Sequence, residues 1–324
     1  MKELLPNIYY GTIPAETASQ NDVNIYMVHD RSQTLFIDSG YDTRSSLHFF
    51  QEVFSQFHIR PEKTILFLTH YHIDHTGMAW WFDQQGIDIY MHKKEYEDAR
   101  TGLARVRTEI CRTCGLHDAE IGVLKNRVFD STDYRPFFFE AKTLRSGELL
   151  QIGPYRFRTV LLRGHTRAQL GLYEANAGIL FSGDHILKGI SPIVITEGID
   201  QHYLRTYYRD LSMVSSLKVR YLLPAHSRIL TSPQEVDEVI SETEISYAHL
   251  CDTVKQIVKA SARPMTAYQT VLKIYRRTRT AMRPALGLRQ YLMTQKVLCA
   301  LEYLYDQDQV SRTILSDGSL AYHY

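Results

Sequence analysis

Four side chains that can bind metal ions fall within the run HYHIDH at residues 70–75, which follows the apolar run TILFL after the single residue Thr69. Imidazole and carboxylate groups together suit zinc, iron or manganese. His70 and His72 alternate in an extended turn and can share one ion. Asp74 and His75 fall where a helix is expected to begin, so they can reach a second ion nearby. The run therefore predicts metal-assisted chemistry at this point of the chain.

Three further residues of the same kinds follow other apolar runs. His165 comes after RFRTVLLRG, Asp184 after GILFSG and His226 after RYLLPA. A single His or Asp in such a place is usually a cap or a satisfied core group. The same order of strand, turn and N or O ligand, repeated four times, instead predicts one metal site. His185, next to Asp184, is a weaker candidate for a residue that lines the metal site.

The elements that must position these residues alternate between short apolar runs and polar or helical stretches over the first 230 residues, which indicates a layered α/β domain. The predicted strands are Asn24–His29, Thr34–Ile37, Thr64–Leu68, Asp88–Met91, Tyr155–Leu162, Gly178–Phe181 and Arg220–Leu223. Between Lys93 and Ser146 the pattern changes, and we interpret this stretch as a helical insertion that could serve as a lid.

The last part of the chain, residues 231–324, has the spacing of three helices and a hairpin. They are predicted at Gln234–Val258, Thr266–Tyr275, Leu288–Tyr305 and Gln309–Tyr322. This order is the outline of a winged-helix module. We therefore expect two domains, 1–230 and 231–324.

Composition narrows the classes of function. The chain has 37 Lys or Arg and 36 Asp or Glu, so a main role in coating nucleic acid or an anionic membrane is not expected. No apolar run is long enough to span a bilayer, and the start MKELLPNIYYG lacks signal-peptide features. Four cysteines fit a reducing compartment. We expect a cytoplasmic protein without a membrane partner.

One local charge pattern keeps nucleic acid open as a partner. Residues 247–324 hold eleven Lys or Arg against five Asp or Glu, including the cluster Arg276, Arg277, Arg279 and Arg283. The preceding residues 231–246 hold five acidic residues and no basic one. Opposite charges on adjacent helices commonly pair with each other and face solvent. We therefore favour charge pairing between these two segments over nucleic-acid binding.

The motifs taken together resemble the metallo-β-lactamase superfamily, and within it the glyoxalase II-like hydrolases. They are HYHIDH at 70–75, GHT at 164–166, GD at 183–184 and AH at 225–226, with FIDSG at 36–40 extending the match. The resemblance implies a four-layer αβ/βα sandwich, with the metal ions at one edge of two facing sheets. In this family, winged-helix-like tails shape the substrate pocket or a dimer interface, so a homodimer remains an alternative to a monomer.

The resemblance also implies the roles of the ligands in a site for two divalent transition-metal ions, zinc favoured and iron or manganese open. The first ion would be held by His70, His72 and His165, and the second by Asp74, His75 and His226, with Asp184 bridging both. Two cations flanking one water give a hydroxide nucleophile. Asp74 would accept and return its proton, and Asp38 would support the ligands by hydrogen bonding.

The implied activity is hydrolysis of a small acyl compound, with a thioester favoured. A lactonase uses the same ligands and stays open, as does a phosphodiesterase or small ribonuclease that uses the basic tail. Arg167-Ala168-Gln169 stands where many relatives have Pro-Gly-His, and the basic C-terminal pattern that holds glutathione is missing, so strict glutathione specificity is not expected. Tyr207 and Tyr208, expected in a loop between ligand-bearing strands, are weaker candidates for substrate contact.

Overall fold

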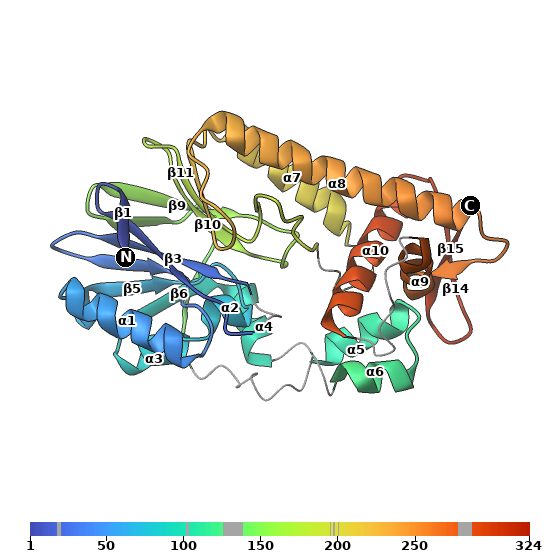
Figure 1. The fold of residues 1–324 in the computed structure, drawn as a ribbon, viewed down its shortest axis with the longest axis horizontal. Helices are drawn as coiled ribbons and strands as arrows, with labels where there is room; N and C mark the ends of the chain where they lie inside the picture. Colours follow the sequence, from blue (N-terminus) through green and yellow to red (C-terminus); the bar gives the residue numbers. More distant parts are fainter. Residues whose placement is uncertain are drawn as a thin grey trace. The chain divides into compact units, whose positions relative to one another are not determined.

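The fold was described from a computed structural model of the chain (Figure 1). It describes residues 1–17, 21–101, 104–125, 139–194, 196, 198–199, 201–277 and 287–324. Contacts divide the chain into two compact units. The first unit comprises Met1–Thr101, Arg135–Pro192 and Asp210–Ile240, and the second unit comprises Gly102–Tyr134, Ile193–Arg209 and Ser241–Tyr324.

The first unit contains a seven-stranded sheet with its strands in chain order. They are β1 (Lys2–Leu5), β2 (Ile8–Ile13), β3 (Val23–His29), β4 (Thr34–Ile37), β5 (Thr64–Phe67), β6 (Asp88–His92) and β7 (Lys142–Leu144). Strands β1 to β4 pair antiparallel, and β4 to β7 pair parallel. The carboxyl ends of β4, β5 and β6 therefore lie at one edge of this sheet.

A second sheet of the same unit has five strands in the order β12-β11-β10-β9-β8. They are β8 (Leu149–Ile152), β9 (Tyr155–Leu161), β10 (Leu170–Glu174), β11 (Ile179–Gly183) and β12 (Tyr221–Pro224). One apolar core contains residues of both sheets, and the rings of Tyr26 and Phe181 meet in it at 5.3 Å. The two sheets therefore face each other across a shared core.

Helices cover the other face of the seven-stranded sheet (Figure 1). Phe36 of β4 contacts Phe50 of α1 (Arg44–Gln56) and Phe82 of α3 (Ala79–Gln84), with ring centroids 5.7 and 5.4 Å apart. Thr43 caps α1 by accepting a hydrogen bond from the backbone N–H of Ser46. These aromatic side chains are buried between the sheet and the helices, and this burial holds α1 and α3 against the strands.

The second unit is largely helical, and α7 and α8 contribute residues to both units. Its elements include α5 (Ala104–Thr113), α6 (Asp118–Leu124), α7 (Tyr203–Ser216), α8 (Pro233–Lys259), α9 (Ala267–Arg277), α10 (Leu288–Asp306), β13 (Met265–Thr266), β14 (Ser311–Ile314) and β15 (Leu320–His323). The three helices and the hairpin predicted after residue 231 are found at the expected places. Their interpretation as a winged helix, and the domain boundary at 230, stay predictions.

Segments far apart in the sequence pack together in this second unit. The backbone N–H of Tyr268 donates to the carbonyl oxygen of Cys114 at 3.0 Å. A Cβ atom at Gly115 would lie within 2.5–2.7 Å of the Thr266 side chain, and Gly115 has φ +86°. A side chain at this position would therefore collide with Thr266 and strain the backbone.

The predicted helical insertion at 93–146 needs one correction. Helices α4 (Lys93–Thr101), α5 and α6 are present, but Lys142–Leu144 is strand β7, paired with β6 in parallel. A short run such as KTL carries too little pattern to reveal a strand. Residues 126–138, and Arg279 and Arg283 of the basic cluster, lie outside the described residues. Among the helices described, none is long and apolar enough to cross a membrane.

Candidate metal centre

The predicted ligands lie in loops that leave four strands of the first unit. His70 and His72 follow β5, and the short helix α2 (Ile73–Thr76) carries Asp74 and His75. Gly77, which follows α2, lies so close to the loop after β4 that a Cβ atom would meet its backbone at 2.3–2.6 Å. Only glycine permits this approach, which fixes α2 against the end of β4.

The first ligand group consists of His70, His72 and His165. Nδ1 of His72 lies 2.9 Å from Nε2 of His70 and 2.9 Å from Nε2 of His165. One ring nitrogen offers either one hydrogen or one lone pair, so His72 cannot form both contacts as good hydrogen bonds. Ring nitrogens bound to one tetrahedral zinc lie about 3.3 Å apart, since each Zn–N bond is about 2.0–2.1 Å. The three nitrogens therefore fit one metal ion.

The second ligand group consists of Asp74, His75 and His226. Nε2 of His226 lies 3.1 Å from Oδ2 of Asp74, and Nε2 of His75 lies 3.7 Å from Oδ1 of Asp74. Nε2 of His75 is buried and makes no hydrogen bond. A buried polar atom without a hydrogen bond is costly, and a cation between these groups would satisfy it.

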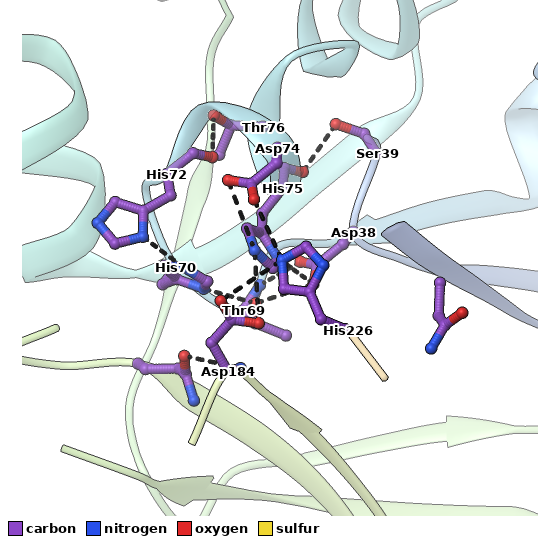
Figure 2. A network of polar contacts seen from close by, with 12 residues as sticks. Asp38, Ser39, Thr69, His70, His72, Asp74, His75, Thr76, Asp184 and His226 are labelled. Atoms are coloured by element: carbon purple, nitrogen blue, oxygen red, sulfur yellow. Dashed lines mark hydrogen bonds and ion pairs between the residues drawn. The ribbon is translucent and has the colours of Figure 1, made fainter. Parts of the chain in front are cut away.

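Asp184 lies between the two groups. Its Oδ2 is 3.5 Å from Nε2 of both His165 and His226, and its Oδ1 is 3.7 Å from Nε2 of His75. These separations are too long for strong hydrogen bonds. Figure 2 shows Asp184 beneath His75 and His226. A carboxylate in this place can reach ions held by either group.

All seven predicted ligands thus gather at one edge of the first unit. Three sets of side chains each have ligand atoms within 4.8 Å of one another: His70, His72 and His165; His70, His75 and Asp184; and Asp74, His75 and His226. The donor set of imidazole nitrogens and carboxylate oxygens fits zinc, iron or manganese. His and Asp groups are therefore positioned for a metal site, while the role of each residue stays a prediction.

Charge and burial at His70 and Asp184 favour the protonation states that metal ligation requires. Burial and the neighbouring imidazoles hold the pKa of His70 well below its usual value, so its ring is neutral. Burial opposes the ionisation of Asp184, but His226 and His75 outweigh it and lower the pKa of Asp184. Neutral imidazoles beside ionised carboxylates are the forms that bind metal ions.

The second group shows the opposite shift at its histidines. Although burial lowers it, Asp38, Asp74 and Asp184 raise the pKa of His75 well above its usual value. In the same way Asp184 and Asp74 raise the pKa of His226 to about 9. The carboxylates therefore attract positive charge to this point, which a metal ion can supply in place of a proton.

Asp38 orients two of the ligand rings from the loop after β4. Its Oδ1 accepts the backbone N–H of Thr69 at 2.8 Å, and its Oδ2 accepts the Thr69 hydroxyl at 2.9 Å and Nδ1–H of His75 at 2.8 Å. Because the single hydroxyl hydrogen of Thr69 goes to Asp38, Thr69 Oγ1 accepts Nδ1–H of His70, 3.0 Å away. Nε2 of the neutral His70 ring then faces the cluster with a lone pair, and Nε2 of His75 does so once a metal ion replaces its proton (Figure 2).

Three residues that support the ligand loops were not predicted from the sequence. Gln169 is buried and braces the turn before Asp184, because its Nε2 donates to Ser182 O at 2.9 Å and its Oε1 accepts the Asp184 N–H at 3.3 Å. Asp210 of α7 accepts hydrogen bonds from the backbone N–H of Arg163 at 2.9 Å and from Nε and Nη2 of its guanidinium at 2.8 and 2.7 Å. Glu95 of α4 accepts hydrogen bonds from both loops that carry the first ligand group.

Of the weaker candidates, His185 is packed in the interior and the two tyrosines lie on a helix. His185 is fully buried, and burial lowers its pKa to about 3, which indicates a packed neutral ring. The prediction that Tyr207 and Tyr208 lie in a loop is wrong, since both belong to helix α7. In the second unit Tyr207 packs on Tyr247 at 5.9 Å and Tyr208 on Tyr303 at 5.6 Å. Substrate contact by these residues stays a prediction.

Comparison with protein families and with curated proteins agrees with this geometry. The model of the Metallo-beta-lactamase superfamily matches residues 19–226. The human acyl-coenzyme A thioesterase MBLAC2 is 24% identical over 215 residues, 64% of this chain and 74% of that protein. The hydroxyacylglutathione hydrolase GloC of Haemophilus influenzae is 24% identical over 178 residues, 55% of this chain and 71% of that protein. The prediction of a hydrolase is confirmed at this level.

Solved structures show the fold. A metallo-beta-lactamase family protein from Thermus thermophilus superimposes with a TM-score of 0.78 at 20% identity, covering 99% of each chain. A beta-lactamase domain protein from Burkholderia ambifaria gives a TM-score of 0.75 at 20% identity, covering 100% of this chain and 94% of the other. The predicted αβ/βα sandwich with a helical C-terminal region is confirmed.

Proposed function

Because the chain belongs to the metallo-β-lactamase superfamily, we propose that it is a metal-dependent hydrolase of thioesters, with acyl-coenzyme A compounds as its first substrate class. The observation that carries the proposal is the convergence of seven nitrogen- and oxygen-bearing ligands on one cluster. Two similar proteins, the human and the Haemophilus influenzae enzymes, are named for thioester substrates. A thioester is therefore the favoured bond.

The residues of the cluster divide naturally between two ions. His70, His72 and His165 would hold one ion, Asp74, His75 and His226 the other, and Asp184 both. Zinc is the proposed metal, and the same donor set suits iron or manganese. When bound, such ions supply a water nucleophile at neutral pH and a positive charge that polarises the thioester carbonyl.

Asp74 is the proposed proton carrier. Burial opposes its ionisation, but His75 and His226 outweigh it and hold the pKa of Asp74 below its usual value. The carboxylate is therefore ionised, and its place in the cluster would let it accept a proton from the attacking water and return it to the departing thiolate. The Tyr41 hydroxyl lies 3.5 Å from Asp74 Oδ2. Burial, followed by the charge of Asp74, raises the pKa of Tyr41, so its phenol keeps its proton and faces Asp74 as a donor.

An assay panel tests the substrate class. Acyl-coenzyme A, acylglutathione, a lactone and bis-p-nitrophenyl phosphate would be compared with protein of measured metal content. We expect thioesters to be cleaved fastest, with activity lost after chelation and restored by zinc. Cleavage of the phosphodiester alone would overturn the proposal in favour of a phosphodiesterase, and cleavage of the lactone alone in favour of a lactonase.

A pair of variants tests the role of Asp74. Asp74→Asn removes the proton carrier, and we expect kcat to fall about 100- to 10,000-fold. Asp88→Asn is the control, because Asp88 is an exposed carboxylate of the same unit that pairs with Lys142. Equal activity of both variants would exclude Asp74 as the proton carrier.

A further inference from the structure

We infer that Glu95 positions the first ligand group by joining the two loops that carry it. This inference rests on the proposed function, because it assigns a residue to the same metal site. Glu95 lies in the first turn of α4 and has no exposed surface. Its position follows from the sheet, since α4 begins where β6 ends and β6 is the parallel neighbour of β5.

The two carboxylate oxygens of Glu95 are shared between loops from the two different sheets. Oε2 accepts the backbone N–H of Tyr71, the residue between His70 and His72, at 3.1 Å. Oε1 accepts the Thr166 hydroxyl and the Ala168 N–H, each at 2.8 Å, directly after His165. Glu95 thus touches the chain beside every member of the first ligand group.

The charged form of Glu95 suits this task. An ionised carboxylate only accepts hydrogen bonds, and three donors converge on it here. Bonds to a charged acceptor are stronger than neutral ones, which offsets the cost of burying the carboxylate. A glutamine in its place would turn an N–H toward one of the loops, donor against donor, and so release that loop.

The expected consequence concerns the metal ion. Metal–ligand distances tolerate about 0.2 Å, so a small shift of one loop relative to the other misplaces a ring nitrogen. Loss of a supporting group around a metal site typically costs roughly 10- to 100-fold in metal affinity. Loss of Glu95 is therefore expected to weaken the ion held by the first ligand group and to spare the ion held by the second.

Asp98 provides a matched control on the same helix. It is 4% exposed, and its carboxylate accepts hydrogen bonds from the side chains of Lys94 and Arg167 at 3.0 and 3.2 Å. Asp98→Asn changes a buried carboxylate to an amide, as Glu95→Gln does, without changing a contact to the backbone of a ligand loop.

The test uses the full chain after a chelator has removed its metal. Binding of Zn²⁺ is measured by calorimetry and binding of Co²⁺ by absorption. We expect wild type and Asp98→Asn to bind two ions, and Glu95→Gln to bind one of them roughly 10- to 100-fold more weakly. Hydrogen exchange measured without metal should speed up in Glu95→Gln at the peptide containing Tyr71 or at the one containing Ala168. If Glu95→Gln matches the wild type in both its metal affinities and its hydrogen exchange, the inference is overturned.

Two further outcomes are separable. If wild type binds two ions but cleaves no thioester, the proposed function fails while the titration still decides the role of Glu95. If Glu95→Gln does not fold, Glu95→Asp takes its place, because it keeps the charge but is one methylene too short to reach both loops. Unchanged binding of both ions by Glu95→Asp would overturn the inference.

Discussion

Asp38 and Glu95 are two buried carboxylates that serve the same cluster from different places. Asp38, after β4, acts on side chains and fixes the rings of His70 and His75 through their Nδ1 atoms. Glu95, at the start of α4, acts on loops and holds backbone N–H groups. Orientation of a ring and placement of a loop are therefore separate tasks. We expect Asp38 to influence both ions and Glu95 only the first.

Among changes to the supporting groups, the largest effect on metal binding should come from Asp38→Asn, because it should weaken the binding of both ions. An amide cannot accept from the Thr69 backbone, the Thr69 hydroxyl and His75 at once, so one donor meets another. We expect the affinity for both ions to fall roughly 10- to 100-fold, with thioesterase activity falling in parallel. The backbone should be little affected, because Asp38 has φ 62°, which asparagine also tolerates. Metal titration checks this, and loss of only one ion would contradict the division between Asp38 and Glu95.

Thr69→Val should have a narrower effect. It removes the hydroxyl that links Asp38 to His70 and leaves the bond from Asp38 to His75 in place. We expect the first ion alone to bind about tenfold more weakly, the lower end of the range for such supporting groups. Thr159→Val is the control, since Thr159 is an equally buried threonine whose hydroxyl donates to Arg145 O. Equal metal affinities in the two variants would refute the role of Thr69.

Thr166→Val should give the smallest change. It removes one of the three hydrogen bonds to Glu95 and keeps the backbone bond from Ala168 to the same oxygen. One hydrogen bond contributes about 0.5–1.5 kcal/mol to folding, about 2- to 13-fold in an equilibrium constant, and only part of this reaches metal binding, so we expect the affinity for the first ion to fall by less than about tenfold. Calorimetric titration beside Thr159→Val measures it. If Thr166→Val lost more affinity for the first ion than Thr69→Val, Glu95 rather than Asp38 would be the stronger support of that ion.

The same two carboxylates show what a sequence reveals about the site. Asp38 lies in FIDSG, a run that ends a strand, so its place near the ligands could be expected. Glu95 lies in KKEYED, which has the composition of an exposed helix. Its burial depends on where β6 delivers α4, which is a property of the whole sheet. Gln169 was missed for the same reason, because its side chain reaches a turn on another strand.

The elements follow a similar rule. Strands with long β-branched or apolar runs were predicted within a residue or two, as at β4 and β5. The strand β10, with the sequence LGLYE, was missed because its glycine and glutamate weaken the pattern, although every one of its residues is buried. Helix α7 was interpreted as a loop. Its tyrosines are helical because they pack against other aromatic rings of the second unit, which local spacing does not reveal.

The packing of Gly115 and Cys114 against Thr266 and Tyr268 has a consequence for how the protein is made. A ribosome releases the chain from its N-terminus, so α5 and α6 are synthesised well before the segment that buries them. Their apolar side chains, among them Ile110 and Ile121, are then exposed in the nascent chain before their partners have been synthesised. A stop codon shortly after residue 241 would leave these helices permanently uncovered, and the truncated product would be prone to aggregate.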